Sequence, residues 1–450
     1  MSALFSAESR IKAFRRLWIS LAKAQKKLGF PISNDQIKEM EKHLDKIDFK
    51  AAETYEKRLR HDVMAHIHTF GDACPKAKPI IHLGATSCFV TDNADLILFK
   101  EALGLLTGKL VQAMKLLSSF AAKEANTPTL SYTHFQSAQP TTVGKRACLW
   151  LQDFLLDAQD WMRLYRDLPF LGAKGATGTQ SSFLALFEGS ETKVLELERL
   201  IARDFGFTKV LPISGQTYTR KLDLNLLNAF ESFAASAHKM GTDVRLLAHD
   251  GELSETFEKN QVGSSAMPYK RNPIYSERIC GLSRFVMSLS QNPAYTLATQ
   301  WLERSLDDSS NRRLSLPEAF LGVDALLNLL SHLFENLQAN PSLSFQRIEA
   351  ALPSLVMENI LMKAVKKGGS RQELHEKLRR LTNQPLEKLI EAIAQDPEFG
   401  LQKKEIKPLL SIPSLVGRAP EQVRDFLQKE IDPVLKTWKG IKPKPSKIEI

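Results

Sequence analysis

The sequence has little cysteine. Four cysteines occur in 450 residues, and no two of them form a Cys-x-x-Cys pair. A disulfide framework or a cysteine-ligated zinc site needs several cysteines at regular short spacing. Both classes are therefore excluded, and we expect reduced thiols at Cys74, Cys88, Cys148 and Cys280.

Long apolar runs are also lacking. The stretch 1–16 already carries Glu8, Arg10, Lys12, Arg15 and Arg16, so it has no apolar core of a signal peptide. No later stretch is expected to reach the length that a bilayer requires. We therefore expect a cytoplasmic protein with no membrane partner.

Two nucleotide-related signatures are missing. The glycine-rich stretch 172–182 lacks the Gly-Lys-Ser/Thr ending of a phosphate-binding loop, and no strand is predicted before it. Lys and Arg number 61 against 51 Asp and Glu, a net charge of +10 that attracts anions. The basic residues alternate with acidic ones along predicted helices such as 37–60, and no nucleic-acid-binding motif appears. We expect a small anionic substrate and no nucleic acid.

Long amphipathic helices dominate what is present. Between Leu96 and Leu117, apolar residues recur every three or four positions, which is typical of a helix with one buried stripe. The same period returns in 151–165, 222–247, 279–289 and 320–337. Five such helices predict a bundle, and the strand signal is weak.

The predicted fold is therefore all-α, with three helical domains. Residues 1–86 precede the bundle, residues 87–339 form it, and residues 340–450 follow the Asn-Pro break at 340–341. Hydrophobic residues make up 43% and charged residues 25%, an ordinary globular composition. A chain of this length buries enough surface for two or three domains.

The segment 263–273, GSSAMPYKRNP, is the most specific chemical feature. One interpretation is a solvated loop punctuated by turn residues. The alternative is a mobile loop whose hydroxyls, backbone N–H groups and lysine remove a proton and hold the resulting anion. Composition alone leaves both open.

Histidines mark two further segments. His134 lies among polar residues in 131–146, just before a predicted helix, and is either structural or a general acid or base. The segment 60–68, RHDVMAHIH, places His61 and His66 five positions apart, with no matching cysteine or acidic ligand set. That spacing argues against a metal site.

Two segments could bind anions. The stretch 81–93, IHLGATSCFVTDN, is either a simple capping turn or a carboxylate cradle at a helix N-terminus. The stretch 302–313, LERSLDDSSNRR, is either a solvated charged face or a phosphate clamp. The clamp would be built from Arg304, Arg312 and Arg313.

Together, GSSAMPYKRNP, TSCFVTDN and THFQSAQPTT resemble the three conserved regions of the fumarase/aspartase superfamily, whose members eliminate fumarate from a succinyl group. RHDVMAHIHTF, GQTYTRK and LERSLDDSSNRR are similar to its eukaryotic adenylosuccinate lyase branch. The resemblance covers nearly the whole chain. It implies β-elimination of fumarate without a cofactor or metal, from adenylosuccinate to give AMP and from its imidazole counterpart SAICAR to give AICAR.

The same resemblance implies residue roles. Ser264 matches the base that removes the proton beside the succinyl carboxylate, His134 the acid that protonates the departing nitrogen, and His61 a second active-site histidine. Positions that match substrate-binding or supporting residues are Arg60, Asp62, Thr86, Ser87, Thr133, Gln216, Lys270, Asn272, Glu277 and Arg278. Those that match the phosphate site are Arg304, Ser309 and Arg313. The superfamily also implies a homotetramer in which four bundles form one helical core and share their active sites.

The chain departs from the family pattern at three places. Ser131 stands where the family usually has glycine, and Ser137 where it often has proline. A Ser-Arg-Tyr phosphate contact of relatives has no counterpart before Phe5, so we expect the three phosphate-site residues to carry that role.

Two alternatives remain open. Argininosuccinate lyase shares the GSSxMPxKxNP loop and needs no phosphate clamp. A non-catalytic relative, of the kind found among lens crystallins, would keep the fold without turnover. Fumarate release from adenylosuccinate or from argininosuccinate distinguishes these alternatives.

Overall fold

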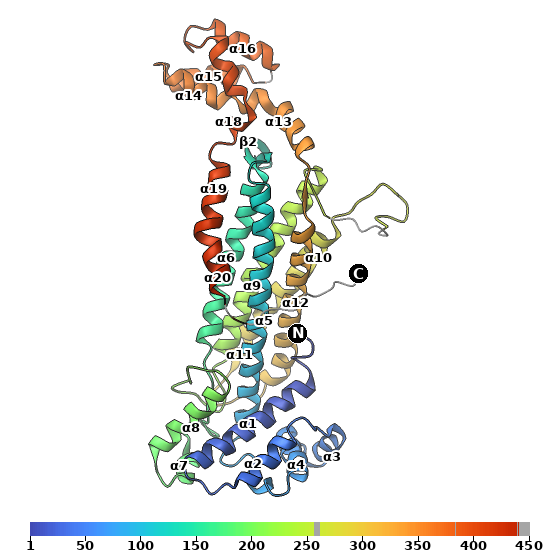
Figure 1. Cartoon of the computed structure of the whole chain (residues 1–450), viewed down its shortest axis with the longest axis vertical. Helices are drawn as coiled ribbons and strands as arrows, with labels where there is room; N and C mark the ends of the chain where they lie inside the picture. The colour runs from blue at the N-terminus through green and yellow to red at the C-terminus, as the bar shows by residue number, and fades with distance from the viewer. Residues whose placement is uncertain (256–261, 383, 439, 441–450) are drawn as a thin grey trace.

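Five long helices form the body of the molecule (Figure 1). The computed structural model describes residues 1–255, 262–382, 384–438 and 440, and all structural statements refer to these. The predicted all-α class and the central bundle are confirmed, because each long helix contains one of the predicted apolar stripes. The helices are α5 (Ser87–Lys123), α6 (Val143–Asp167), α9 (Lys221–His249), α10 (Ile274–Leu289) and α12 (Asp308–Asn336).

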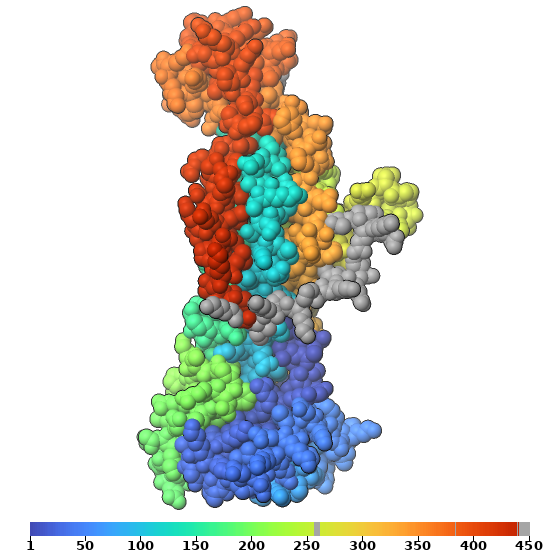
Figure 2. All heavy atoms as spheres, in the orientation of Figure 1, coloured from blue at the N-terminus to red at the C-terminus, as the bar shows by residue number. Residues whose placement is uncertain are grey.

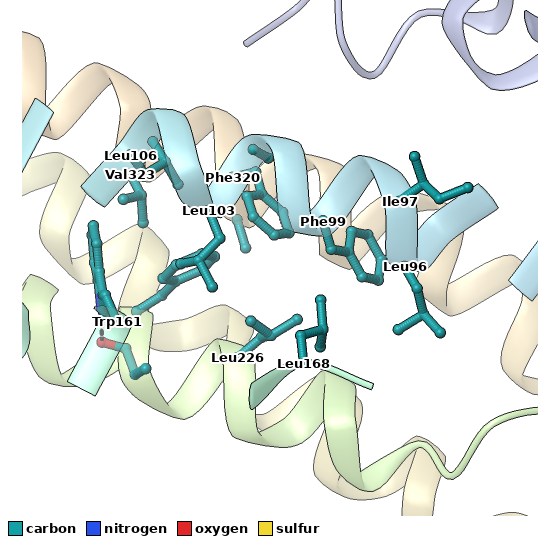
Figure 3. Packing of buried hydrophobic residues seen from close by; sticks show 14 of the residues in the cluster. Leu96, Ile97, Phe99, Leu103, Leu106, Trp161, Leu168, Leu226, Phe320 and Val323 are labelled. Carbon is teal, nitrogen blue, oxygen red and sulfur yellow. Dashed lines mark hydrogen bonds between the residues drawn. The ribbon is translucent and has the colours of Figure 1, made fainter. Parts of the chain in front are cut away.

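Aliphatic and aromatic side chains together fill the centre of the bundle (Figure 3). Phe320 of α12 stacks on Phe99 of α5, with ring centroids 5.4 Å apart, and meets Phe230 of α9 edge-on at 4.9 Å. Trp161 of α6 is fully buried, and its indole N–H donates to the Ala229 carbonyl oxygen at 3.3 Å. The apolar stripes therefore meet along the bundle axis.

A β-hairpin connects α5 to α6, although the strand signal in the sequence is weak. Its strands are β1 (Pro128–Thr133) and β2 (Gln136–Thr142), which pair antiparallel. Gly144, at the start of α6, allows the close approach of α5, since a Cβ there would lie 2.4 Å from the Ala121 carbonyl oxygen. A second short pair joins β3 (Leu253–Ser254) to β4 (Gln338–Ala339).

A second set of helices packs at one end of the bundle (Figure 1). Trp18 and Phe70 stack in their core, with ring centroids 5.9 Å apart. The first helix of the set packs against α5 and α8. The set comprises α1 (Ala7–Lys27), α2 (Asn34–Lys42), α3 (Phe49–Leu59), α4 (Asp62–Ala73), η1 (Lys78–Ile80), α7 (Ser181–Leu186) and α8 (Glu191–Asp204).

The C-terminal segment divides into two parts. At the opposite end of the bundle lie α13 (Pro341–Leu355), α14 (Met357–Val365), α15 (Arg371–Arg380), α16 (Leu386–Gln395), α17 (Lys403–Ile406), η2 (Lys407–Leu410) and α18 (Ile412–Leu415), most of them around a core of their own. The chain then returns along the bundle as α19 (Ala419–Phe426), η3 (Leu427–Ile431) and α20 (Asp432–Thr437) (Figure 2). Val423 and Ile431 of this return belong to the main core. The domain limits 1–86, 87–339 and 340–450 stay a prediction, and part of the last range lies outside the described residues.

One helix corrects an expectation from the sequence. By length and composition α12 is apolar enough to cross a membrane. Half of its most apolar window is buried in the molecule, where α12 packs against α5, α9 and α10. Its apolar character thus serves the bundle core.

All four cysteines are unpaired and buried. Burial raises the pKa of the Cys88 and Cys148 thiols to about 12 and that of Cys74 to about 11. A thiol with so high a pKa stays protonated near neutral pH and reacts slowly.

We expect Phe320→Ala to lower the free energy of unfolding by about 3–5 kcal/mol, because it empties the aromatic centre of the bundle. Phe345→Ala is the matched control. That ring is 44% exposed on α13, so its loss should change stability by no more than about 0.5 kcal/mol. Chemical denaturation followed by circular dichroism measures both, and equal losses would contradict the assignment of the core.

Candidate active site

A cleft of about 1130 Å³ lies where the N-terminal helices meet the bundle. Its walls come from the α3–α4 turn, the start of α5, the segment before α9 and the start of α12. Segments far apart in the sequence thus converge. Nine residues whose roles the family resemblance implies line it, and so does Arg312 of the proposed clamp. The nine are Arg60, His61, Asp62, Thr86, Ser87, Gln216, Arg304, Ser309 and Arg313.

The N-terminus of α5 opens into this cleft. Thr86 is the N-cap residue, and its side chain makes no capping hydrogen bond. The first N–H groups of a helix lack intrahelical partners, and the helix dipole adds partial positive charge there. With the hydroxyls of Thr86 and Ser87, this end of α5 offers a cradle for a carboxylate.

His61 faces the same cradle. Arg60 ends α3 in the left-handed conformation, with φ 56°, and the turn makes His61 the N-cap of α4. The Nδ1 atom of His61 accepts a hydrogen bond from the Met64 N–H at 3.3 Å. In the neutral ring Nε2 then carries the proton, and Nε2 lies 3.5 Å from the Ser87 hydroxyl. His61 therefore presents a donor to the cleft.

The other two histidines of the segment 60–68, His66 and His68, are not among the residues that line the cleft. His66 is half-buried and meets the Phe14 ring edge-on at 6.5 Å, and its partial burial lowers its pKa. His68 stacks on Tyr55 at 5.1 Å. The three imidazole rings therefore have different surroundings, and of the three only His61 lines the cleft.

Gln216 is held from three sides. Its backbone N–H donates to the Glu303 carbonyl oxygen at 3.0 Å, and its amide nitrogen donates to the Ala176 carbonyl oxygen at 3.1 Å. The Cys88 thiol donates to its amide oxygen at 3.4 Å. Gly215 is required beside it, since a Cβ there would lie 2.5 Å from the same Glu303 carbonyl oxygen. Gln216 is thus fixed on the cleft wall.

Two arginines border the cleft near the start of α12. Arg304 donates from Nη1 to both carboxylate oxygens of Asp308, at 3.0 and 3.1 Å. Arg313 donates to Asp62 at 3.3 Å and is 56% exposed. Both keep further N–H groups for an anion, as a guanidinium has five.

Arg312, the third arginine of the proposed clamp, also lines the cleft but is buried and paired with groups of the protein. Its Nε donates to Asp223 at 2.7 Å and its Nη2 to Asp95 at 3.2 Å. The same Nη2 also donates to the hydroxyl of the buried Tyr218, which in turn donates to Asp223 at 2.6 Å. Burial alone would lower the pKa of Arg312, but the facing carboxylates raise it well above its usual value. Arg312 is therefore a structural cation.

Arg220 makes a second buried ion pair beside it. Its Nη1 donates to Asp92 of α5 at 2.9 Å, and its Nε donates to Asp308 of α12 at 2.7 Å. Burial disfavours its charge, but Asp92 and the other negative groups around it, Asp223 among them, together outweigh burial, and the pKa of Arg220 is raised. The two arginines tie α5, α9 and α12 together behind the cleft.

Sequence reasoning did not find this network. A signal for it exists: Asp92 and Asp95 precede Phe99 by seven and four positions, which places them on the apolar stripe of α5. A charge on a buried stripe implies a buried partner.

The remaining proposed residues lie elsewhere in the chain. His134 and Phe135 form the two-residue turn of the hairpin, with φ 52° and 57°, the pattern of a type I′ turn. His134 and Thr133 are exposed there. Ser131, a departure from the family pattern, lies at the irregularity of β1, where its hydroxyl donates to the Gln139 carbonyl oxygen.

The segment 262–273 projects from the side of the bundle (Figures 1 and 2). Within it, the Ser264 hydroxyl oxygen accepts hydrogen bonds from the N–H groups of Ala266 and Met267, at 3.2 and 3.1 Å. The Asn272 amide donates to the Gly263 carbonyl oxygen at 2.9 Å and closes the segment. A smaller hollow includes Lys270, Asn272 and Glu277 among its lining residues, and Arg278 is exposed on the first turns of α10.

A single chain therefore does not bring all the candidate catalytic and binding residues together. The cleft is at the N-terminus of α5, and the hairpin follows its C-terminus. α5 has 37 residues, or ~55 Å at 1.5 Å per residue. The cleft and the His134 turn thus lie at opposite ends of the bundle.

Comparison with known proteins identifies the fold and the family. The 3-carboxy-cis,cis-muconate lactonizing enzyme of Pseudomonas putida superposes with a TM-score of 0.81 at 21% identity, covering 96% of this chain and 97% of that one. Fumarate lyase of Mesorhizobium sp. BNC1 gives 0.80 at 22%, covering 97% of each. The fold is that of the fumarase/aspartase superfamily of lyases.

Residues 11–288 match the family described as Lyase, and residues 353–426 match the adenylosuccinate lyase C-terminus. Adenylosuccinate lyase of Schizosaccharomyces pombe is 48% identical, covering 98% of this chain and 94% of the relative. That of Saccharomyces cerevisiae is 47% identical, covering 97% and 93%. The chain belongs to the adenylosuccinate lyase family, which confirms the resemblance drawn from its motifs.

We expect Asp92→Asn to destabilise the protein by about 3 kcal/mol or more, because it removes one of the carboxylates that balance the buried Arg220. Asp160→Asn is the control: Asp160 pairs with Arg163 at 2.9 Å on the exposed face of α6. Its loss should cost less than about 1 kcal/mol. Urea unfolding of the two variants tests this, and a loss at Asp92 as small as that at Asp160 would refute a stabilising role for the network.

Proposed function

We propose that this chain catalyses the β-elimination of fumarate from adenylosuccinate, giving AMP, and from SAICAR, giving AICAR, without a cofactor. The observation that carries the proposal is the 48% identity to an adenylosuccinate lyase over 98% of the chain. The cleft supports it, because two sets of its lining residues offer donors for the two anionic groups of such a substrate. The cytoplasmic location expected from the sequence stays a prediction.

The succinyl group is assigned to the cradle at α5. Thr86 and Ser87 supply hydroxyls, and the uncapped helix end supplies N–H groups. Gln216, fixed on the wall, adds an amide. The phosphate is assigned to Arg304 and Arg313 with Ser309, since guanidinium groups form paired N–H bonds to phosphate oxygens.

Ser264 is assigned as the base. A serine acts as a base only after its hydroxyl has lost its proton, and this ionisation requires that the negative charge on the oxygen be stabilised. The two N–H groups that already donate to the Ser264 oxygen stabilise that charge. Loop closure and exclusion of water would strengthen these bonds further. Lys270 and Asn272, in the same segment, are assigned to the dianionic aci-carboxylate that forms when the proton leaves.

His134 is assigned as the acid that protonates the departing nitrogen, and Thr133 as its neighbour in contact with the substrate. The exposed position at a hairpin tip lets the imidazole reach beyond its own chain. Such a left-handed pair of non-glycine residues costs roughly 1–2 kcal/mol per residue, and strain of this kind is often found at functional sites.

We further propose a homotetramer in which each active site combines elements of several chains. The ~55 Å length of α5 separates the cleft from the His134 hairpin within one chain, so a second chain must supply the acid. Apolar side chains left exposed on the bundle helices suit contact with other bundles. They include Leu149, Leu156, Phe285 and Leu314.

Ser264→Ala and His134→Ala should each reduce kcat by well over tenfold while substrate binding stays near that of the wild type, because the chemical step loses its base or its acid. We assign the acid and the base of each site to different chains. Mixing the two inactive variants should therefore restore part of the activity, since hybrid tetramers contain sites with both residues intact. Fumarate release followed by absorbance measures each case. Light scattering checks the mass, and a fully active monomer with no complementation would rule out shared sites.

Arg304→Ala and Arg313→Ala should each raise KM for adenylosuccinate about tenfold or more by removing a charge-assisted contact to phosphate. With succinyladenosine, which lacks the phosphate, the same substitutions should have little effect. Steady-state kinetics with both compounds decides the assignment. An equal penalty on nucleotide and nucleoside would mean that these arginines maintain the structure and do not bind phosphate.

A further inference from the structure

A short segment after α9 touches both elements that carry the proposed acid and base. It runs from Glu252 to Glu255 and contains β3. Leu253 is buried in the main core and pairs with Ala339 of β4. The Glu252 N–H donates to the Leu247 carbonyl oxygen, and its own carbonyl accepts from Asn340, each at 2.9 Å. The segment is therefore fixed to the end of the bundle.

Glu252 holds the hairpin that ends in His134. Its carboxylate is buried and accepts hydrogen bonds from the Thr129 hydroxyl and, at 3.4 Å, from the Tyr132 hydroxyl, both on β1. Two arginines balance its charge. Arg146 of α6 lies 3.8 Å away and itself donates to Thr129 at 3.1 Å, while Arg347 of α13 donates to Glu252 at 3.4 Å.

Glu255 holds the end of the segment that carries Ser264. α10 begins directly after that segment, and its N-cap residue, Pro273, provides no side-chain hydrogen bond. The Glu255 carboxylate replaces the cap: it accepts from the N–H groups of Tyr275 and Ser276, at 2.9 and 2.8 Å, and from the Ser276 hydroxyl. A negative charge at a helix N-terminus is stabilised by the helix dipole.

We propose that Glu252 and Glu255 are positioning residues. They fix two elements to one rigid segment: the hairpin 128–142 that carries His134, here called the acid hairpin, and the segment 262–273 that carries Ser264, here called the base loop. The proposal rests on the roles of His134 and Ser264 given above. Neither glutamate touches the reacting groups. Each acts through the element that it holds: Glu252 through β1, and Glu255 through the start of α10, where the base loop ends. Misplacement of a catalytic group by about 1 Å is enough to slow an enzyme substantially.

Hydrogen exchange tests the contacts without using activity. Glu255→Gln should speed exchange several-fold in 262–273, because an amide in place of the carboxylate loses the charge and disrupts the cap, and should leave 128–142 unchanged. Glu252→Gln should speed exchange in 128–142 and leave 262–273 unchanged. Glu349→Gln, an exposed residue of α13, is the matched control and should change neither. If Glu252→Gln fails to fold, Arg347→Gln perturbs the same carboxylate from a less buried position and should loosen the hairpin.

Kinetics tests the positioning role. Glu255→Gln should lower kcat roughly 10- to 100-fold with KM changed less than about twofold, and Glu255→Asp should recover part of the loss by restoring the charge. With substrate deuterated at the carbon that loses its proton, Glu255→Gln should show a larger isotope effect on kcat than the wild type. Glu252→Gln, which disturbs the acid, should slow turnover without that increase.

The outcomes separate this proposal from the proposed function. A wild-type protein that releases no fumarate overturns the function, while the exchange patterns still decide whether the two glutamates hold their elements. An active wild type with kcat unchanged in Glu255→Gln overturns the positioning role. The positioning role is also overturned if Glu255→Gln is slower but keeps the wild-type isotope effect. It is overturned as well if exchange rises equally in 128–142 and 262–273. A general loss of structure would give either result.

Discussion

The buried arginines of the bundle end are the constraint on which the site depends. Arg220 and Arg312 are each enclosed by protein and would be strongly unfavourable there without partners. Their partners come from three helices: Asp92 and Asp95 from α5, Asp223 from α9 and Asp308 from α12. Since each carboxylate is in place only when its helix is, the network specifies how the three helix ends meet.

This network also determines which arginines are free for a ligand. Arg312 and Arg313 are neighbours on α12, and successive residues of a helix point about 100° apart. Both line the cleft, but Arg312 is buried against carboxylates of the protein, while Arg313 is exposed. Arg304 shares Asp308 with the buried Arg220, so its guanidinium is oriented before any anion binds. Oriented donors stabilise an anion without paying for reorganisation.

The length of the bundle determines where the other candidate catalytic elements lie. Long helices give the molecule its core, but they also put the α5 cradle at one end and the hairpin at the other (Figure 1). The hairpin and the base loop are both fastened near β3, at the end where α9 terminates. The proposed sharing of sites between chains answers this separation, because antiparallel copies would bring opposite ends of two bundles together.

The sequence by itself determined the all-α class, the five bundle helices and the family. Helical period is a property of contiguous residues, and the apolar stripes from Leu96 onward display it without any partner. The motifs are likewise contiguous, so they could be matched directly. Nine candidate residues were found in this way and do line one cleft.

Three features became known only from the tertiary structure. They are the hairpin at His134, the buried pairing of Arg312 and the cap that Glu255 gives to α10. The hairpin lacks the Asn-Gly or Asp-Gly turn that would have marked it. The other two depend on partners distant in the chain: Arg312 meets Asp223 across 89 positions, and Glu255 meets Ser276 across 21. A charged side chain looks the same in a sequence whether it is solvated or paired, because its burial is set by what packs against it.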